Sequence, residues 1–257
     1  MSDDQKARVQ AQFGPSAAAY VASAGHAGGA DLEQLLAWGR KRAAQRVLDI
    51  ATGGGHTALA FSRFTPSVVA VDLTLPMLRA ARDFASSEHA PVRFLAADVE
   101  ALPFQDASFG TVTCRIAAHH FPALLPALRQ VARVLRPGGS LLVQDILGHD
   151  DQTASAFILE VERRRDASHV RAFRQLEWTA FLRAAGFTVM DEAIMTKRRP
   201  WEEWTGRMRM SPEAKSDLER FVLAAPAPAR AAFDFVIEDG RVQSFTDRML
   251  LLRADRD

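Results

Sequence analysis

Cysteine, long apolar runs and excess charge are all scarce in this sequence. Its 257 residues include one cysteine, Cys114, which excludes an internal disulfide framework and a zinc site built from several thiolates. No apolar run reaches the roughly 18 residues that a membrane helix needs, so no membrane span is predicted. The first residues lack the basic start and apolar stretch of a secretory signal. From these absences we expect a soluble, cytoplasmic protein.

Charges of the two signs nearly cancel. Lysine and arginine together number 32, against 31 for aspartate and glutamate, so the formal net charge is +1. A protein that binds nucleic acid by neutralising phosphates normally has a clear basic excess. The balance therefore argues against a nucleic-acid partner and favours a small-molecule substrate. We expect the protein to act as a monomer or a homodimer.

Short apolar runs alternate with helical stretches through the middle of the chain. Because these runs are apolar along nearly their whole length, they predict parallel strands with helices on both faces of one sheet. The expected fold class is therefore α/β, of the doubly wound type. The predicted strands cover residues 46–50, 67–72, 92–96, 111–116 and 140–145, with 187–196 and 248–253 as later candidates.

The two flanks of this alternating region have a different pattern. Residues 1–40 are rich in alanine and glycine, and residues 200–239 are helical, with Ser211 as a good helix cap. We expect one domain over residues 1–257, in which 1–40 and 200–239 form a helical cap. The core then covers about 44–196 and 242–257. Open α/β sheets bind ligands at the carboxyl ends of their strands, and we expect the cap to cover that edge.

A glycine cluster joins the first predicted strand to a helix. Gly53, Gly55 and Ala58 fit the pattern G-x-G-x-x-A, in which glycines let a ligand approach the start of the helix. Taken alone, the pattern fits a plain turn, an adenosine-containing ligand or a nicotinamide dinucleotide. A nicotinamide-dependent oxidoreductase that uses this loop is therefore one hypothesis, and a non-catalytic cofactor-binding module is another.

Acidic residues after three of the strands favour an adenosyl ligand that has no phosphate. Asp72 ends the second strand, where a carboxylate can bind the hydroxyls of a ribose. Asp98 follows the third strand, where its side chain and the next backbone N–H can read an adenine edge. Asp49 directly precedes the glycine loop, where its charge would repel a pyrophosphate. S-adenosyl-L-methionine carries an ammonium and a sulfonium instead, so it suits this site better.

Six segments occur together here: 47–55, 71–72, 98–104, 108–110, 119–121 and 135–139. As a set they resemble class I S-adenosylmethionine-dependent methyltransferases, of the branch that includes ubiquinone and menaquinone biosynthesis C-methyltransferases. The resemblance is strong over about residues 44–147. It implies a Rossmann-like, seven-stranded, mostly parallel sheet of order 3-2-1-4-5-7-6. It also implies methyl transfer to a small or medium-sized organic molecule by in-line displacement. One departure is Ala51, where the family usually has glycine.

The resemblance further implies which residues bind the cofactor. The glycine loop approaches the methionine part, Asp72 holds the ribose, and backbone groups ending the fourth strand bind the ammonium. Tyr20, the one tyrosine of the chain, closes over the sulfonium through a cation–π contact, worth roughly 0.5–2 kcal/mol. Met77 fits the apolar core equally well. The implied cofactor-binding residues are Tyr20, Asp49, Ala51, Gly53, Gly55, Asp72, Leu73, Met77, Asp98, Val99, Cys114 and Arg115.

Two adjacent histidines follow the fourth strand, near the expected position of the methyl group. Positioning alone can drive methyl transfer, and a base is needed only where the acceptor loses a proton. We expect His120 to reach the substrate, with His119 as the other candidate, although a structural role fits them equally well. The pair has no third partner to hold a metal, so none is expected. Candidate substrate contacts are Phe13, Glu160, Arg164 and His169; Glu160 and Arg164, four residues apart, also fit a surface ion pair.

Overall fold

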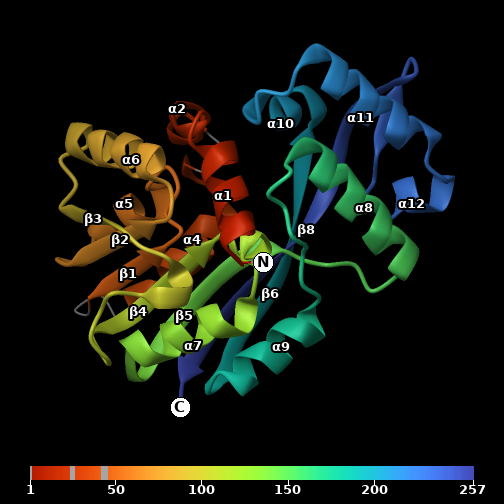
Figure 1. The fold of residues 1–257 in the computed structure, drawn as a ribbon. Helices are drawn as coiled ribbons and strands as arrows, with labels where there is room; N and C mark the ends of the chain where they lie inside the picture. Colours follow the sequence, from red (N-terminus) through yellow and green to blue (C-terminus); the bar gives the residue numbers. More distant parts are fainter. Residues whose placement is uncertain (1, 24–26, 42–45) are drawn as a thin grey trace.

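One sheet organises the chain, whose computed structural model describes residues 2–23, 27–41 and 46–257 (Figure 1). Within these residues its strands follow the order β3-β2-β1-β4-β5-β8-β6, and β7 pairs with β8. The first five strands are parallel, and β8 runs antiparallel to β5 and β6. Apart from the short β7, β8 is the seventh strand along the chain, so the expected order 3-2-1-4-5-7-6 is confirmed. The strands are β1 Val47–Ile50, β2 Val68–Asp72, β3 Val92–Ala96, β4 Phe109–Arg115, β5 Leu135–Ile146, β6 Phe187–Pro200, β7 Val236–Glu238 and β8 Arg241–Arg256.

The central strands are buried because helices cover both faces of the sheet. Every residue of β1, β2 and β4 is buried, and successive side chains point to opposite faces. In β2, Val68 packs in the apolar cluster of one face and Val69 in that of the other. Helices α4 (Ala30–Arg40) and α5 (His56–Ser62) cover the first face. The second face packs against α7 (Leu124–Val134) and α9 (Gln175–Ala184), while α6 (Leu75–Ser87) packs beside β2 and β3.

The cap has an apolar core of its own. Phe157, Trp201, Trp204, Val222 and Phe245 belong to one buried cluster that is separate from the two clusters of the sheet. Helix α8 and the outer part of β8 also belong to this cluster, whereas α4, which lies inside the predicted cap of residues 1–40 and 200–239, packs on the sheet instead. In Figure 1 the cap helices stand beside the sheet on the extended antiparallel pair of β6 and β8. The cap helices are α8 Gln152–Arg165, α10 Trp201–Arg207, α11 Pro212–Ala224 and α12 Ala227–Ala231.

The antiparallel strands β6 and β8 are longer than the sequence predicts. The expected strands were 187–196 and 248–253, whereas β6 continues to Pro200 and β8 begins at Arg241. The added segments are polar, so an apolar pattern does not reveal them. They are held by a buried ion pair instead, in which Arg199 Nε lies 2.6 Å from Asp247 Oδ2. Arg199 is therefore buried although it belongs to a run of three basic residues, 197–199.

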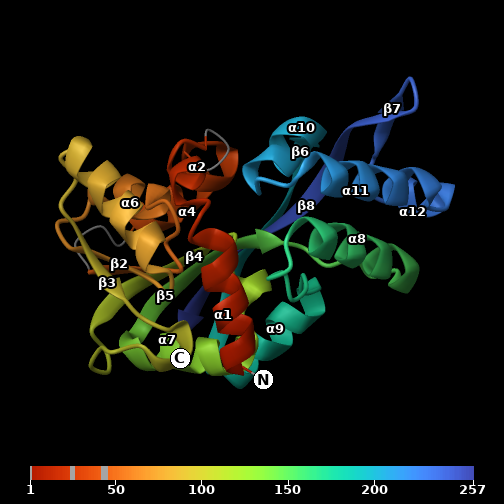
Figure 2. The same ribbon diagram turned by 45° about the horizontal axis from the view of Figure 1, so that its top comes forward.

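Two N-terminal helices, α1 (Ser2–Phe13) and α2 (Ala17–Val21), lie between the sheet and the cap (Figure 2). Side chains of α1 reach the segments that follow three strands. Gln10 Nε2 donates to Leu73 O after β2, and Lys6 Nζ lies 2.6 Å from Asp98 Oδ2 after β3. Gln5 Nε2 donates to Ser168 O at 2.5 Å and to His120 O, after β4, at 3.4 Å. Helix α1 therefore covers the carboxyl ends of the parallel strands. No helix among the described residues is long and apolar enough to span a membrane.

Two helical glycines give a matched test of this packing. A Cβ added at Gly39 in α4 would lie 2.3 Å from Cε1 of the fully buried Phe61, whereas one added at Gly206 in α10 meets nothing within 4 Å. We expect Gly39→Ala to lower the free energy of unfolding by about 1–3 kcal/mol through overpacking. Gly206→Ala is expected to raise it by about 0.5–1 kcal/mol, because alanine favours the helix. Urea unfolding of both variants measures this, and equal effects would contradict the packing of α4 on α5.

Candidate functional site

Two cavities meet above the carboxyl ends of the parallel strands. The first, of about 130 Å³, lies between the glycine loop, the segments after β2 and β3, and α1. The second, of about 50 Å³, lies between the sheet and the cap. Phe13, Tyr20, Ile116 and His120 line both cavities and thus form a shared wall. Such an arrangement suits a site in which two ligands meet.

The end of β2 holds the glycine loop in place. Asp72 Oδ2 accepts a hydrogen bond from the Gly53 N–H at 2.9 Å, and Oδ1 accepts one from the Thr74 N–H at 2.8 Å. Burial raises the pKa of Asp72, although these backbone donors oppose the shift. Asp72 lines the first cavity together with Leu73, so its carboxylate faces the space that a ligand would occupy.

Asp49 supports the same loop from below. Its side chain is nearly inaccessible, and its two oxygens accept hydrogen bonds of 2.6 Å from the Thr113 and Thr52 hydroxyls. Thr52 lines the first cavity, whereas Asp49 does not. Burial raises the pKa of Asp49 to about 6. The carboxylate is therefore kept ionised at neutral pH at a cost in stability, which marks it as a functional candidate.

Ala51 adopts a backbone conformation that favours glycine. Its φ is +50°, in the left-handed region, where a Cβ costs roughly 1–2 kcal/mol. This is the position at which the sequence departs from the family pattern, so the loop keeps its shape although the residue changes. Gly54 is needed for another reason, since a Cβ there would lie 3.1 Å from the backbone of Tyr20. The loop thus packs directly beneath α2.

A lysine of α1 occupies the edge of the first cavity. Lys6 Nζ lies 2.6 Å from both Asp98 Oδ2 and Glu100 Oε2. Burial lowers the pKa of Lys6, but the two carboxylates outweigh this effect and raise the pKa overall. Asp98 Oδ1 also accepts a hydrogen bond from the Glu100 N–H, and Asp98 thereby caps the start of the short helix η1 (Val99–Ala101). Asp98 and Val99 both line the cavity. The segment that contains Asp98 and Val99 therefore lies beneath α1 and borders the cavity.

The shared wall consists of aromatic rings and one strained residue. The Phe13 ring meets Tyr20 edge-on at 5.3 Å and His120 edge-on at 5.0 Å between ring centroids. Tyr20 Oη donates to Met208 Sδ at 3.4 Å, which connects α2 to the cap. Ile116 has a φ of +55°, which is rare for a β-branched residue and typical of strained functional segments.

The two histidines after β4 have different partners. His119 Nδ1 lies 2.5 Å from Asp145 Oδ1; burial opposes the charged ring, but Asp145 outweighs it and raises the pKa of His119. His120 Nδ1 lies 3.1 Å from Ser168 O, and burial together with the neighbouring His119 lowers its pKa to about 4. His120 is therefore neutral near pH 7, with Nδ1–H donating to Ser168 and Nε2 available as an acceptor. Nε2 lies 3.7 Å from Asp166 Oδ2.

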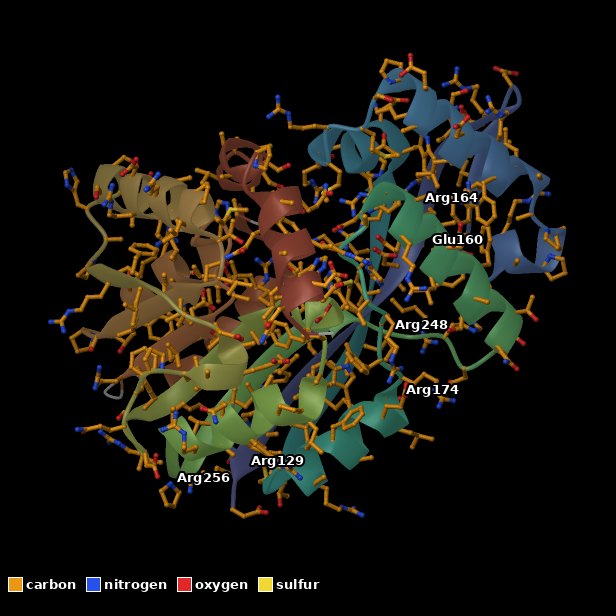
Figure 3. The ribbon with its side chains drawn as sticks, in the orientation of Figure 1. Arg129, Glu160, Arg164, Arg174, Arg248 and Arg256 are labelled. Atoms are coloured by element: carbon orange, nitrogen blue, oxygen red, sulfur yellow. The ribbon has the colours of Figure 1, made fainter. Side chains whose placement is uncertain are left out.

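The predicted substrate contacts are not all brought together. Glu160 and Arg164 form a half-exposed ion pair of 2.8 Å on the side of α8 away from α1, outside both cavities (Figure 3). Their neighbours Glu162 and Arg165 line the second cavity instead. His169 is buried and lines a third cavity of about 160 Å³, which shares Glu162 with the second.

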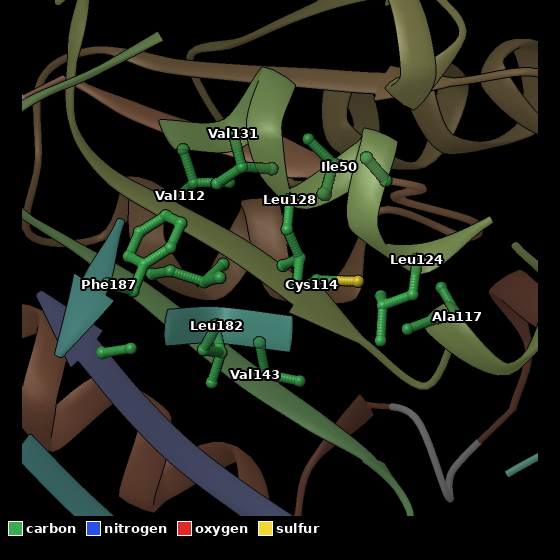
Figure 4. Close-up of a cluster of buried hydrophobic side chains, with 14 of the residues drawn as sticks. Ile50, Val112, Cys114, Ala117, Leu124, Leu128, Val131, Val143, Leu182 and Phe187 are labelled. Carbon is green, nitrogen blue, oxygen red and sulfur yellow. The ribbon is translucent and has the colours of Figure 1, made fainter. Parts of the chain in front are cut away.

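Other predicted residues lie in the core around the site. Cys114 points into the apolar cluster beneath α7, beside Leu124 and Leu128 (Figure 4), and burial raises its pKa well above the usual value. Met77 is 2% exposed and also lines the first cavity, so it belongs to both core and site. Gly55 begins α5, and Arg115 lines the first cavity while its Nε donates to Gln144 Oε1 at 2.7 Å.

Nine of the residues that line the second cavity are not among the predicted site residues: Ile116, Ile146, Glu162, Arg165, Asp166, Arg199, Trp204, Arg207 and Asp247. Arg199 and Asp247 face each other only because β6 and β8 pair, and Arg207 is placed by the packing of α10 in the cap. No local motif marks them. Among the residues that the structure describes, no group of three or more His, Cys, Asp or Glu side chains could hold a metal ion.

Comparison with known proteins identifies similar chains. Residues 48–143 match the family model of the methyltransferase domain. The Bacillus subtilis protein named uncharacterized methyltransferase YcgJ is 34% identical over 228 residues, which cover 88% of this chain and 90% of that protein. Its crystal structure covers 87% of this chain and 98% of its own, with 33% identity and a TM-score of 0.82.

Two further proteins extend the comparison. A crystal structure from Bacillus halodurans C-125, put forward as a methyltransferase, is 39% identical with a TM-score of 0.84 and covers 88% of this chain and 99% of that one. The ubiquinone/menaquinone biosynthesis C-methyltransferase UbiE of Dinoroseobacter shibae is 41% identical over 115 residues, 43% of this chain and 46% of that protein. The likeness to UbiE is therefore confined to less than half of each chain.

The burial of Asp49 predicts a pH-dependent stability. A carboxyl whose pKa is raised from 3.8 to about 6 on folding destabilises the native state above pH 6 and ceases to do so near pH 4. We expect Asp49→Asn to raise the free energy of unfolding by about 1–3 kcal/mol at pH 7.5, because the buried charge is removed while the amide accepts a hydrogen bond from one threonine hydroxyl and donates one to the other. The gain should vanish near pH 4. Asp83→Asn, at an exposed aspartate, is the control, and a gain that is equal at both pH values would contradict the assignment.

Proposed function

The chain belongs to the methyltransferase domain family, and we propose that it transfers a methyl group from S-adenosyl-L-methionine to a small or medium-sized organic molecule. The resemblance predicted from the sequence is confirmed, including the relation to UbiE. The identity of the cofactor and the class of the methyl acceptor are our proposal. The observation that carries them is the wall of Phe13, Tyr20, Ile116 and His120 between two cavities, because two reactants must meet at such a wall.

The first cavity fits S-adenosyl-L-methionine in its chemistry. Asp72 would hold the ribose, since a carboxylate that accepts two backbone N–H groups still has lone pairs free. Asp98 and the Val99 N–H would read the adenine. Glu100 Oε1 is buried and makes no hydrogen bond among the described residues, which is unusual in a folded protein unless a ligand supplies the donor.

Charge in the first cavity supports a cationic ligand over a pyrophosphate. Asp49 lies under the loop and Asp72 beside it, and both are buried. A phosphate at the loop would meet the carboxylate of Asp49 in a poorly solvated space, which is unfavourable. An ammonium would meet favourable charge at the same place. The buried charge of Asp49 destabilises the free protein, and it would attract the ammonium of such a ligand.

When bound, S-adenosyl-L-methionine supplies a methyl group on a positively charged sulfur. Residues of this chain hold the acceptor in line with that group and exclude water. The rings of Phe13 and Tyr20 border both cavities and present electron-rich faces, which attract a positive charge. Helix α1 and the cap close the site from the two sides.

His120 is the residue proposed to take a proton from the acceptor. Its Nδ1–H is fixed by the carbonyl of Ser168, which leaves Nε2 as the basic atom. Burial keeps the ring neutral near pH 7, so the lone pair of Nε2 is free, and the charge of the nearby Asp166 raises the pKa of the ring against that burial. Asp166, 3.7 Å from Nε2, would stabilise the imidazolium that forms. His119 supports this arrangement through its tight contact with Asp145 and is a positioning residue in this scheme.

Calorimetric titration tests the cofactor assignment. We expect S-adenosyl-L-methionine and S-adenosylhomocysteine to bind with one site per chain, and NAD to show no binding, because its pyrophosphate would meet the charge of Asp49. Absence of binding by both adenosyl compounds would contradict the proposal. Binding of NAD at comparable affinity would favour an oxidoreductase that uses the glycine loop instead.

A second experiment separates the roles of two residues. Asp72→Ala is expected to weaken S-adenosylhomocysteine about tenfold or more, because it removes ribose hydrogen bonds to a charged group and releases the Gly53 N–H. His120→Ala should change the affinity less than about threefold, since His120 is assigned to the acceptor. Titration of both variants measures this. Equal losses of affinity would mean that the two roles are wrongly divided.

A further inference from the structure

The second cavity contains more guanidinium groups than carboxylates able to neutralise them. Arg165, Arg199 and Arg207 all line it. Arg199 is satisfied, since its Nε lies 2.6 Å from Asp247 Oδ2 and both side chains are buried. This pair joins β6 to β8, so Asp247 is not available to the other two arginines. A buried cation without a partner anion is costly, and the remaining two therefore need explanation.

Arg165 is held in place but only partly neutralised. It ends α8, and its Nε donates to Trp204 O at 3.0 Å while its guanidinium carbon lies 4.3 Å from the centroid of the Trp204 ring. Its carboxylate partner is Glu162, whose Oε2 lies 3.4 Å from Nη1. Burial raises the pKa of Glu162 to about 7, so this carboxylate is a weak counter-charge near neutral pH. The guanidinium is thus rigid, and its outer nitrogens can bind a ligand.

The charge of Arg207 is neutralised even less than that of Arg165. Arg207 ends α10 with a side chain only 11% exposed, and its Nη2 lies 3.3 Å from Glu203 Oε1. Glu203 is 60% exposed, so water screens its charge. Burial and the nearby Arg165 lower the pKa of Arg207. A guanidinium has five N–H donors, and most of those on Arg207 make no hydrogen bond within the described residues.

Asp166, the remaining carboxylate of the second cavity, interacts with Ser168 and His120 rather than with the arginines. Asp166 Oδ1 accepts hydrogen bonds from the Ser168 N–H at 2.9 Å and the Ser168 hydroxyl at 2.6 Å. Its Oδ2 faces His120 Nε2. Asp166 therefore shapes the 166–169 turn and orients the base. Within the described residues, no carboxylate is left to pair with both Arg165 and Arg207.

We propose that the substrate carries a carboxylate, and that this group binds in the second cavity between the guanidinium groups of Arg165 and Arg207. The inference rests on the proposed function, because it identifies the substrate class of the same site. A planar guanidinium matches a carboxylate through paired hydrogen bonds. His120 lines the same cavity, so one end of the acceptor meets the arginines while its reacting atom lies at the shared wall. A cavity of about 50 Å³ suits a compact acid.

Matched acids and amides test the proposal. Protein loaded with S-adenosylhomocysteine is titrated with acetate, acetamide, benzoate and benzamide at constant ionic strength, by calorimetry and by NMR of the arginine Nε–H groups. We expect at least one acid to bind about tenfold more tightly than its amide and to shift the Arg165 and Arg207 signals. If neither acid is preferred over its amide, the proposal is wrong. Tighter binding of inorganic phosphate than of either acid would also overturn the carboxylate assignment.

Variants locate the preference. Arg207→Gln should abolish the difference between acid and amide, and Arg207→Lys should retain part of it, because the charge remains but the paired geometry is lost. Glu203→Gln removes the exposed partner of Arg207 and should leave acid binding equal or tighter. Arg220→Gln, at an exposed arginine of α11, is the matched control and should change nothing. Retention of the full preference in Arg207→Gln would contradict the site.

The test separates this inference from the proposed function. Binding of S-adenosylhomocysteine to each variant is measured first, and it reports only on the first cavity. If the wild type binds S-adenosylhomocysteine but shows no preference for acids, the substrate class is wrong and the cofactor assignment stands. If S-adenosylhomocysteine does not bind, the proposed function fails, and titration of the acids into the free protein still reports on Arg165 and Arg207.

Discussion

The hydrogen bonds that Asp72 accepts from the Gly53 and Thr74 N–H groups hold the architecture of the site together. They fix the glycine loop to the end of β2, and the loop in turn holds Ala51 in a left-handed conformation. Because Gly54 has no Cβ, α2 can rest directly on the loop. Tyr20 of α2 then reaches the wall between the cavities. A carboxylate at one strand end thus determines where the aromatic side of the second cavity lies.

Helix α1 links the two cavities into one unit. On one side Lys6 contacts the acidic segment after β3, and on the other Gln5 donates to the Ser168 carbonyl, which also receives the Nδ1–H of His120. Phe13 at the end of α1 packs edge-on against His120. A single helix thus contacts both the acidic segment after β3 and the histidine of the shared wall.

The second cavity combines buried charge with an apolar frame. Trp204 belongs to the apolar core of the cap and also supports the guanidinium of Arg165. The Arg199–Asp247 ion pair joins β6 to β8, the two strands that carry the cap. Buried ion pairs of this kind contribute little net stability compared with apolar packing, but they restrict which ligand can enter. The cap therefore supplies buried charges to the second cavity, while the glycine loop and the segments after β2 and β3 line the first.

Much of the fold and of the first cavity could be predicted from the sequence, because both depend on local patterns. Apolar runs such as 67–72 predict buried parallel strands, and the acids after three strands predict the cofactor edge. The second cavity could not be predicted in this way. Residues 163–165 are three consecutive arginines, and each step along a helix turns the side chain by about 100°. Only the packing of α8 in the tertiary structure decides that Arg165 enters the cavity while Arg164 lies outside it.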